Sequence, residues 1–249
     1  MRPFFISKKQ NSIFQSIFAL AVVMLIFLEL ASAEEPQSQT VNRATGKSSN
    51  QTVNQSANLI DSPSNKSVSK KIIIIGDSLT EGLGVEKNKA FPALLQEKMD
   101  QQKIKYQVVN SGVSGSTTAS ALGRVKWVLS SKPDVVILAL GANDGLRGVP
   151  VKESEKNLQS AIDMLIDKKV KKIILLGVLM PPNYGKSYTE EFKKMYIQLS
   201  KKNKVSLIPF ILDEVAGNPQ LNQADGIHPN EKGHQVIAEK LFPKIKGLL

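Results

Sequence analysis

The sequence from residue 72 to residue 82 reads IIIIGDSLTEG and joins four consecutive isoleucines to a glycine-containing turn. A short, fully apolar run of β-branched residues is typical of a strand buried on both faces, and such strands belong to parallel sheets covered by helices. Gly76 permits a tight turn, after which Ser78 would begin a helical turn with its hydroxyl exposed at the positive end of the helix dipole. This stretch predicts the first strand and the first βα turn of an α/β domain.

The same alternation continues to the end of the chain. Four more apolar runs predict strands, at residues 106–110, 135–140, 172–178 and 205–209. Segments of helical period lie between and after them, at residues 90–101, 118–130, 153–167, 189–202 and 231–246. Strict alternation predicts a three-layer α/β/α sandwich, and five strands indicate a flavodoxin-like, doubly wound parallel sheet. Ligands of such sheets bind beyond the carboxyl ends of the strands.

Three loops that follow predicted strands carry groups suited to catalysis. Ser78 can act as a nucleophile, although a strand-Gly-Asp-Ser string can equally be a helix cap. After the second strand, the two glycines of NSGVSGSTT allow a backbone amide to approach a substrate oxygen. After the third, Asn143 can donate its side-chain amide to a developing oxyanion, although Asn-Asp-Gly is also an ordinary turn. The glycines after the first strand do not fit a phosphate-binding GxxxxGK[ST] loop.

The chain contains two histidines. His234 lies inside the last predicted helix, where a surface or packing role is the simpler interpretation. His228 lies in the loop DGIHPN before that helix, three positions after Asp225. A serine nucleophile needs a base, and the base needs an acceptor that orients its ring, so one loop can supply both. Because these groups fall on one predicted rim, the sequence predicts a catalytic triad of Ser78, His228 and Asp225.

These blocks resemble the four motifs of the GDSL, or SGNH, hydrolases. The matching strings are GDSLTEG with Ser78, NSGVSGSTT with Gly115, GANDGLRG with Asn143, and DGIHPN with Asp225 and His228. They occur in the family's order, and the likeness covers about residues 72–245. The strings PPNYG and GLRG are similar to the subgroup of bacterial periplasmic acyl-CoA thioesterases that are also described as lysophospholipases and arylesterases.

The resemblance implies the SGNH hydrolase fold and a serine esterase or thioesterase that acts on small acyl esters or thioesters, lipids included. Ser78 would attack the acyl carbonyl, His228 would be its base, and Asp225 would orient the base. The amides of Ser78 and Gly115, together with Asn143, would hold the oxyanion of an acyl-enzyme mechanism. The resemblance implies no metal and no organic cofactor.

Two positions depart from that subgroup. Ser116 stands where its members often carry an acidic residue, and Ala142 replaces a frequent glycine. Neither change removes a catalytic group, but the first lies at the lip of the expected acyl site.

Two loops near the rim predict an apolar groove for an acyl chain. The loop at 179–185 combines apolar side chains with two prolines, and the loop after the third strand contributes Leu146 and Val149. Arg147 and Tyr184 would instead suit a sugar by polar contact and stacking, so a carbohydrate O-deacetylase is an alternative. A surface binding module with an inactive triad is a second alternative.

Two segments precede the predicted domain at 70–249. Residues 1–33 combine basic positions, an apolar stretch and a terminal Ala-Ser-Ala, which predicts a secretory signal peptide or, if it is not cleaved, a membrane anchor. Residues 34–69 are rich in Ser, Asn, Gln and Thr, which predicts a disordered tether. We therefore expect an exported protein that is periplasmic or secreted, or held at the membrane by its leader.

The amino-acid composition excludes several kinds of site and partner. The chain has no cysteine, which excludes disulfides, thiolate zinc sites and cysteine nucleophiles. Of its net charge of +11, the leader carries +2 and the tether none, which leaves +9 on the predicted domain. A basic surface of this kind, like the leader, can favour association with anionic membranes. Aromatic residues do not interleave with the lysines, so nucleic acid is not an expected partner.

Overall fold

The computed structural model describes residues 70–249. The expected leader at 1–33 and the expected tether at 34–69 lie outside these residues. Within the described domain, no helix has both the length and the apolar character needed to cross a membrane.

A single five-stranded sheet forms the centre of the domain. All its paired strands are parallel, and their order is β2-β1-β3-β4-β5, which confirms the flavodoxin-like prediction. Its first strand buries Ile72–Ile75 almost completely, as an apolar run covered on both faces should. The strands are β1 (Lys70–Gly76), β2 (Tyr106–Gly112), β3 (Val135–Ala139), β4 (Lys172–Leu176) and β5 (Ser206–Ile208).

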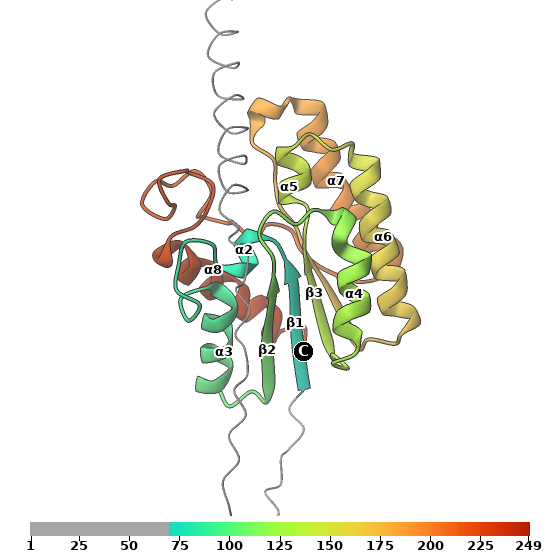
Figure 1. Cartoon of the computed structure of the whole chain (residues 1–249), viewed down its shortest axis with the longest axis vertical. Coiled ribbons are helices and arrows are strands. Elements are labelled where there is room, and N and C mark those ends of the chain that lie inside the picture. The colour runs from blue at the N-terminus through green and yellow to red at the C-terminus, as the bar shows by residue number, and fades with distance from the viewer. Residues whose placement is uncertain (1–69) are drawn as a thin grey trace, which may run out of the picture. The chain divides into compact units, whose positions relative to one another are not determined.

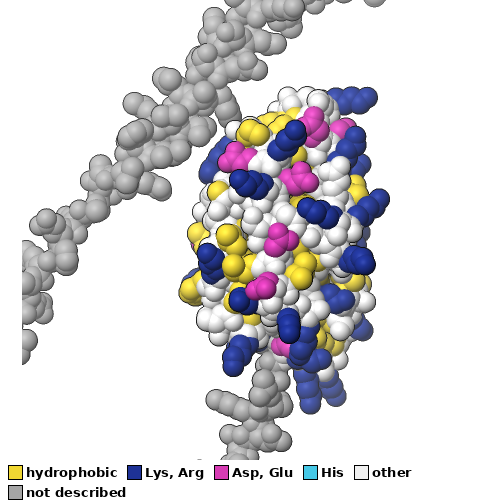
Figure 2. Space-filling model, turned by 90° about the vertical axis from the view of Figure 1, so that its right-hand side faces the viewer, with side chains coloured by type: hydrophobic (Ala, Val, Ile, Leu, Met, Phe, Trp, Pro, Cys, Tyr) yellow, Lys and Arg dark blue, Asp and Glu magenta, His cyan; other side chains and the backbone are white. Residues whose placement is uncertain are grey.

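Two layers of helices cover the sheet and confirm the three-layer sandwich. Helices α3 (Phe91–Gln101) and α8 (Glu231–Lys246) pack against each other on one face. On the other face, α6 (Val151–Asp167) lies between α4 (Ala121–Leu129) and α7 (Lys186–Asn203), as Figure 1 shows. Figure 2 shows the side that carries these three helices, where basic side chains are spread out with acidic ones among them.

Four short elements lie after strands or before long helices: α2 (Ser78–Glu81), α5 (Ala142–Leu146), η2 (Thr118–Ser120) and η3 (Pro182–Tyr184). Two of them correct the sequence-based prediction. The helix expected at 118–130 begins as the separate 3₁₀ turn η2, and the Asn-Asp-Gly sequence at 143–145 lies within a short α-helix instead of a plain turn. In addition, α7 begins at Lys186, three residues before the expected start.

The register of the sheet brings three loops to one edge. Gly76 at the end of β1 pairs with Gly112 of β2 on one side and with Ala139 of β3 on the other. The residues that follow each strand therefore leave the sheet side by side. As predicted, these are the loops that carry Ser78, Gly115 and Asn143.

Candidate active site

Ser78 occupies the first position of α2, directly beyond the end of β1. Asp77 caps this helix, because its Oδ1 accepts a hydrogen bond from the Leu79 amide at 3.0 Å. The capping role considered for this string thus belongs to Asp77, and the Ser78 hydroxyl has another contact. Ser78 Oγ lies 2.9 Å from His228 Nε2, and the serine is 8% exposed.

The loop before α8 holds His228 against Asp225. Their side chains meet through Nδ1 and Oδ2 at 2.6 Å, while Asp225 Oδ1 accepts from the backbone amides of Ile227 at 2.9 Å and His228 at 3.0 Å. Both carboxylate oxygens are therefore held in place. Ser78, His228 and Asp225 form one continuous chain of hydrogen bonds, as the spacing of the blocks predicts.

The environment of Asp225 favours its charged form. Burial by itself would raise the pKa of this carboxyl group. The hydrogen bonds from the backbone and ring of His228 and from the Ile227 amide outweigh burial, so that the pKa of Asp225 lies below its ordinary value. A negative charge at this point keeps the Nδ1 proton of His228 on the ring and leaves Nε2 as the acceptor for Ser78.

Asn143 and Gly115 lie close to each other at the neighbouring loops. Asn143 Nδ2 donates to the carbonyl of Ser116 at 3.0 Å, and the carbonyl of Gly115 accepts from Arg147 Nη2 at 3.2 Å. Gly115 has φ +75°, a conformation that favours glycine. Asn143 lines the same pocket as Ser78 and His228, whereas Gly115 is not among its lining residues.

The two glycines of the NSGVSGSTT segment, Gly112 at the end of β2 and Gly115 beyond it, have different roles. A Cβ on Gly112 would lie 2.1 Å from the backbone nitrogen of Glu81, so this glycine allows β2 to pack closely against α2. A Cβ on Gly115 would meet only the end of Arg147, at 3.7 Å. The close approach that glycine permits at position 112 is thus to α2, and Gly115 stays the predicted donor of a backbone amide.

A buried carboxylate next to Asn143 joins α5 to the segment after β2. Asp144 is 1% exposed and accepts hydrogen bonds from the amide and the hydroxyl of Thr118, at 2.9 and 2.5 Å, and from Ser154 Oγ at 3.1 Å. Sequence reasoning gave no role to this residue, although a charged side chain in the short segment after a buried strand is a usable signal. The contacts hold Asn143 in a defined place above the sheet.

Arg124 of α4 makes a second connection beneath the site. Its guanidinium donates to the carbonyl of Gly76 at 2.6 Å, to Ser116 Oγ at 3.1 Å, and to the carbonyl of Ser111. It thus links the end of β1 to the loop that carries Gly115. The position Ser116, noted as a departure from related sequences, contacts this arginine.

Asp77 is the most strongly perturbed carboxyl group near the site. Burial raises its pKa to about 6, against the opposing effects of its hydrogen bond from Leu79 and the positive charge of Arg124. Its carboxylate faces the helix amide and not the pocket, so its place in the site is structural.

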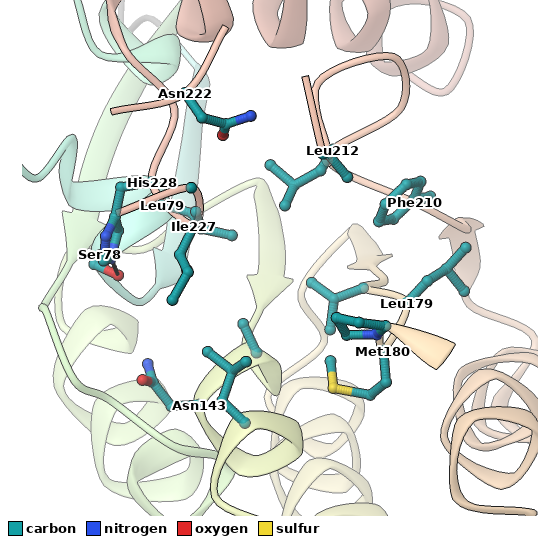
Figure 3. Close-up of a pocket in the computed structure, with 17 residues that line it drawn as sticks. Ser78, Leu79, Asn143, Leu179, Met180, Phe210, Leu212, Asn222, Ile227 and His228 are labelled. Carbon is teal, nitrogen blue, oxygen red and sulfur yellow. Dashed lines mark hydrogen bonds between the residues drawn. The ribbon is translucent and has the colours of Figure 1, made fainter. Parts of the chain in front are cut away.

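A pocket of about 230 Å³ opens beside Ser78 and His228. Figure 3 shows these two side chains together, with Asn143 on the side of α5 and apolar side chains around the rest. The lining includes Leu146 and, from the loop at 179–185, Leu179, Met180 and Pro181, as predicted. It further includes Val178, Phe210, Leu212, Ala216 and Ile227.

Two expectations about this wall are wrong. Val149 does not line the pocket; its carbonyl accepts a hydrogen bond from Tyr188. Tyr184 does not line it either, because its hydroxyl donates to the carbonyl of Leu146 and its ring stacks with Tyr188. Sequence reasoning also missed the contribution of residues 210–222, which form much of the apolar wall. Among residues 70–249, no group of three or more His, Asp or Glu side chains is placed to hold a metal ion.

Comparisons with known proteins agree with this geometry. The profile of the GDSL-like lipase/acylhydrolase family matches residues 74–236. The chain is 36% identical to an esterase, TesA, of Pseudomonas aeruginosa over 74% of its own length and 92% of the relative's. It is also 36% identical to thioesterase 1/protease 1/lysophospholipase L1 of Escherichia coli, over 72% of this chain and 84% of that one.

Solved structures show the same likeness. A crystal structure of TesA superposes with a TM-score of 0.69 at 36% identity, covering 72% of this chain and all of that one. The psychrotrophic esterase EstA from Pseudoalteromonas sp., in a structure inhibited by monoethylphosphonate, also gives a TM-score of 0.69, at 33% identity over 72% of this chain and 97% of that one.

Proposed function

Because this chain belongs to the GDSL-like lipase/acylhydrolase family and is a serine ester hydrolase, we propose that it cleaves esters and thioesters of aliphatic acids through Ser78, His228 and Asp225. One observation carries the proposal. The hydrogen-bonded chain from Ser78 Oγ through the His228 ring to Asp225 lies at the edge of a largely apolar pocket. A nucleophile, its base and a place for an acyl chain therefore adjoin one another.

The reaction proceeds in two halves. As Ser78 Oγ bonds to the acyl carbon, His228 Nε2 takes the hydroxyl proton, and the Asp225 carboxylate stabilises the imidazolium. The tetrahedral intermediate collapses by breaking the bond from the acyl carbon to the alcohol oxygen or the thiol sulfur, which receives the proton from His228. Water then attacks the acyl-enzyme with His228 as base, which releases the carboxylic acid and restores Ser78.

The oxyanion of each intermediate is stabilised by three donors. The Ser78 amide is the first of α2 and has no partner within its own helix. Asn143 Nδ2 uses one proton on the carbonyl of Ser116 and has a second for the substrate. The Gly115 amide completes the set. These groups are held before the reaction starts, so stabilising the new charge requires little reorganisation.

The pocket wall indicates the substrate class. Leu146, Leu179 and Ile227 are at least one-third exposed and apolar, and all three line the pocket. Exposed aliphatic groups next to a nucleophile suit an acyl chain, whereas a sugar ring would need clustered polar and stacking groups. Lysophospholipids, aryl esters and acyl thioesters all present such a chain. The lining thus disfavours the carbohydrate O-deacetylase.

Chain length should govern the rate. Each methylene that the pocket buries contributes at most about 0.8 kcal/mol. We expect kcat/KM to rise several-fold for each two carbons added to an acetyl ester, and to level off once the cavity is filled. If acetyl esters are the best substrates, the deacetylase alternative replaces this proposal.

We also propose that catalysis resides in residues 70–249 and that the N-terminal segment 1–33 directs export. The family profile lies wholly within the first range. The second part rests on the basic, apolar and small-residue pattern of the leader.

A fluorophosphonate probe and a graded series of p-nitrophenyl esters test the proposal together. Wild type should be labelled at Ser78 and should hydrolyse the esters, whereas Ser78→Ala should lose labelling and at least about 10³-fold in kcat. Ser130→Ala, an exposed serine at the end of α4, is the matched control and should behave as wild type. An unlabelled, inactive wild type would favour the binding module, and an active Ser78→Ala would remove the triad.

A further inference from the structure

One polar side chain interrupts the apolar wall of the pocket. Asn222 lies between β5 and α8, is 6% exposed, and lines the same cavity as Ser78 and His228. Burying an amide is costly unless its polar atoms have partners. The hydrogen bonds of Asn222 therefore show which of its polar atoms is free to bind a ligand.

The nitrogen of this amide is fully used by the protein. Nδ2 donates to the carbonyl of Val215 at 2.7 Å and to the carbonyl of Asn218 at 2.8 Å. An amide nitrogen has two protons, so both are engaged. The reverse orientation of the amide would place its oxygen against two carbonyl oxygens, and these two contacts therefore fix which way the group points.

The oxygen of the amide has no such partner. Asn222 Oδ1 accepts no hydrogen bond from any side chain or backbone group within residues 70–249. Figure 3 shows it directed towards the interior of the pocket, away from the loop that receives the nitrogen. An acceptor in this position is left unpaired by a purely apolar ligand, which carries a desolvation penalty.

The backbone holds this oxygen in a fixed relation to the proposed catalytic base. Asn222 pairs with Pro229 in an isolated antiparallel bridge, and its carbonyl accepts from Asn230 Nδ2 at 3.1 Å. The next amide, of Gln223, donates to the carbonyl of His228 at 2.8 Å. These contacts fix Asn222 Oδ1 relative to His228, and hence relative to the place that the substrate carbonyl would take.

The surroundings become more polar at the same place. A second hollow of about 310 Å³ shares Gly217, Asn222 and Gly226 with the pocket, and its other lining residues include Asn218 and Gln223. Asn222 therefore lies where the apolar cavity borders a hollow with a more polar lining. A substituent that reaches this point meets hydrogen-bonding groups and not only aliphatic ones.

We propose that Asn222 is a specificity-determining residue whose Oδ1 accepts a hydrogen bond from a hydroxyl group on the acyl chain, so that hydroxylated acyl esters are preferred substrates. The proposal rests on the proposed function, since it assigns the acyl chain to this pocket. It deepens that function by naming a feature of the chain that the apolar residues cannot recognise.

The test compares octanoyl p-nitrophenyl esters with and without one hydroxyl group. The hydroxyl is placed on the third, sixth, seventh or eighth carbon, because a hydroxyl on the fourth or fifth displaces p-nitrophenol by forming a lactone. In wild type, one position should raise kcat/KM over the plain octanoyl ester by roughly 3- to 10-fold, the size of a neutral hydrogen bond. The gain should lie mainly in KM, since the contact is remote from the reacting carbonyl.

Two variants separate recognition from support of the loop. Asn222→Leu keeps the branched shape of the side chain but removes the acceptor together with the two hydrogen bonds that Nδ2 donates, so the preference should vanish while the plain ester is still hydrolysed. Asn218→Ala removes the local hydrogen bond from the Gln220 amide in the same loop and leaves Oδ1 in place, so both substrates should change in parallel.

Two results overturn the proposal. In the first, wild type hydrolyses none of the hydroxylated esters with a higher kcat/KM than the plain octanoyl ester. In the second, Asn222→Leu prefers a hydroxylated ester as strongly as wild type does. The first needs no variant, so it holds even if Asn222→Leu fails to fold. A wild type that hydrolyses no octanoyl ester at all would contradict the proposed function instead.

Discussion

His234 offers a test of how the fold distinguishes its two histidines. It lies within α8, is 1% exposed, and its Nδ1 accepts a hydrogen bond from the Phe91 amide at 3.3 Å. Its ring also stacks on Phe91, with centroids 6.3 Å apart. Burial, and secondarily the positive charge that His228 can carry, lowers the pKa of His234 from 6.5 to about 4. The packing role expected from its place in the helix is what the structure shows.

This shift makes stability depend on pH in a calculable way. The unfolded chain takes up a proton at His234 near pH 6.5, whereas the folded protein resists it until about pH 4. The contribution of His234 to the free energy of unfolding is therefore fully present above its pKa in the unfolded chain, and it is lost as the pH falls towards its pKa in the folded protein. Between about pH 8 and about pH 5, linkage gives a loss of roughly 2 kcal/mol in the free energy of unfolding.

The assay is urea unfolding of wild type and His234→Gln across that range. Glutamine can still accept from the Phe91 amide through its side-chain oxygen but does not titrate. The stability advantage of wild type over this variant should shrink by about 2 kcal/mol between about pH 8 and about pH 5. Activity at neutral pH should be retained, because His234 does not line the pocket.

Comparison with the variant is necessary because Asp77 titrates in the same range with the opposite sign. Its pKa is raised to about 6 by burial, so the folded state binds a proton first and gains stability as the pH falls. This gain is roughly 1 kcal/mol over the same interval and would mask part of the loss in wild type alone. Asp77 is present in both proteins and cancels in the difference. Parallel pH profiles for the two proteins would refute the reasoning.

Three further predictions concern the site and the domain boundary. Asn143→Ala should lower kcat by roughly 10²–10³ with little change in KM, since its amide binds charge that exists mainly in the transition state; a raised KM with unchanged kcat would make it a ground-state contact. Leu146→Ala should flatten the dependence of kcat/KM on acyl length in the p-nitrophenyl ester series, and an unaltered profile would exclude this residue from the acyl groove. Deleting residues 34–69 should leave kcat/KM for a small soluble ester within about twofold, because a tether adds no wall to the pocket; a large loss would show that this segment contributes to the site.

The sheet was predictable from the sequence because each strand is a short apolar run that can be identified without knowledge of distant residues. The apolar run at 72–75 and its four counterparts read as strands buried on both faces, and the structure confirms all five and their order. Predicted ends differ by up to two residues. Strands β1 and β2 extend into flanking Lys, Ser and Gly residues, whereas β4 ends before apolar residues such as Val178. The convergence of the loops followed from the parallel topology, which the register of β1 with β2 and β3 now shows.

The far wall of the pocket could not be predicted in this way. Residues 209–222 have neither the period of a helix nor that of a strand, so no pattern indicates which side chains point inwards. Phe210, Leu212 and Asn222 reach the cavity through turns that are set by tertiary contacts, such as the hydrogen bond from the Ile211 amide to the carbonyl of Gly177. Val149 was misplaced for the same reason, because loop position alone does not determine direction.

The proposed catalytic groups come from four separate loops. Two charged side chains beneath them, one buried and one partly buried, hold these loops in place relative to one another. Arg124 joins the end of β1 to the loop of Gly115, and Asp144 joins the helix of Asn143 to Thr118. The strand pairing of the sheet does not align these loops with one another, because the strands end before the loops begin. A displacement of about 1 Å at a reacting group can cost on the order of 10²-fold in rate. Hydrogen bonds at 2.5–3.1 Å between the loops therefore fix the relative positions of the proposed catalytic groups. Arg124 lies outside the four matched blocks, and Thr118 and Asp144 lie inside them without being the residues for which the motifs are named.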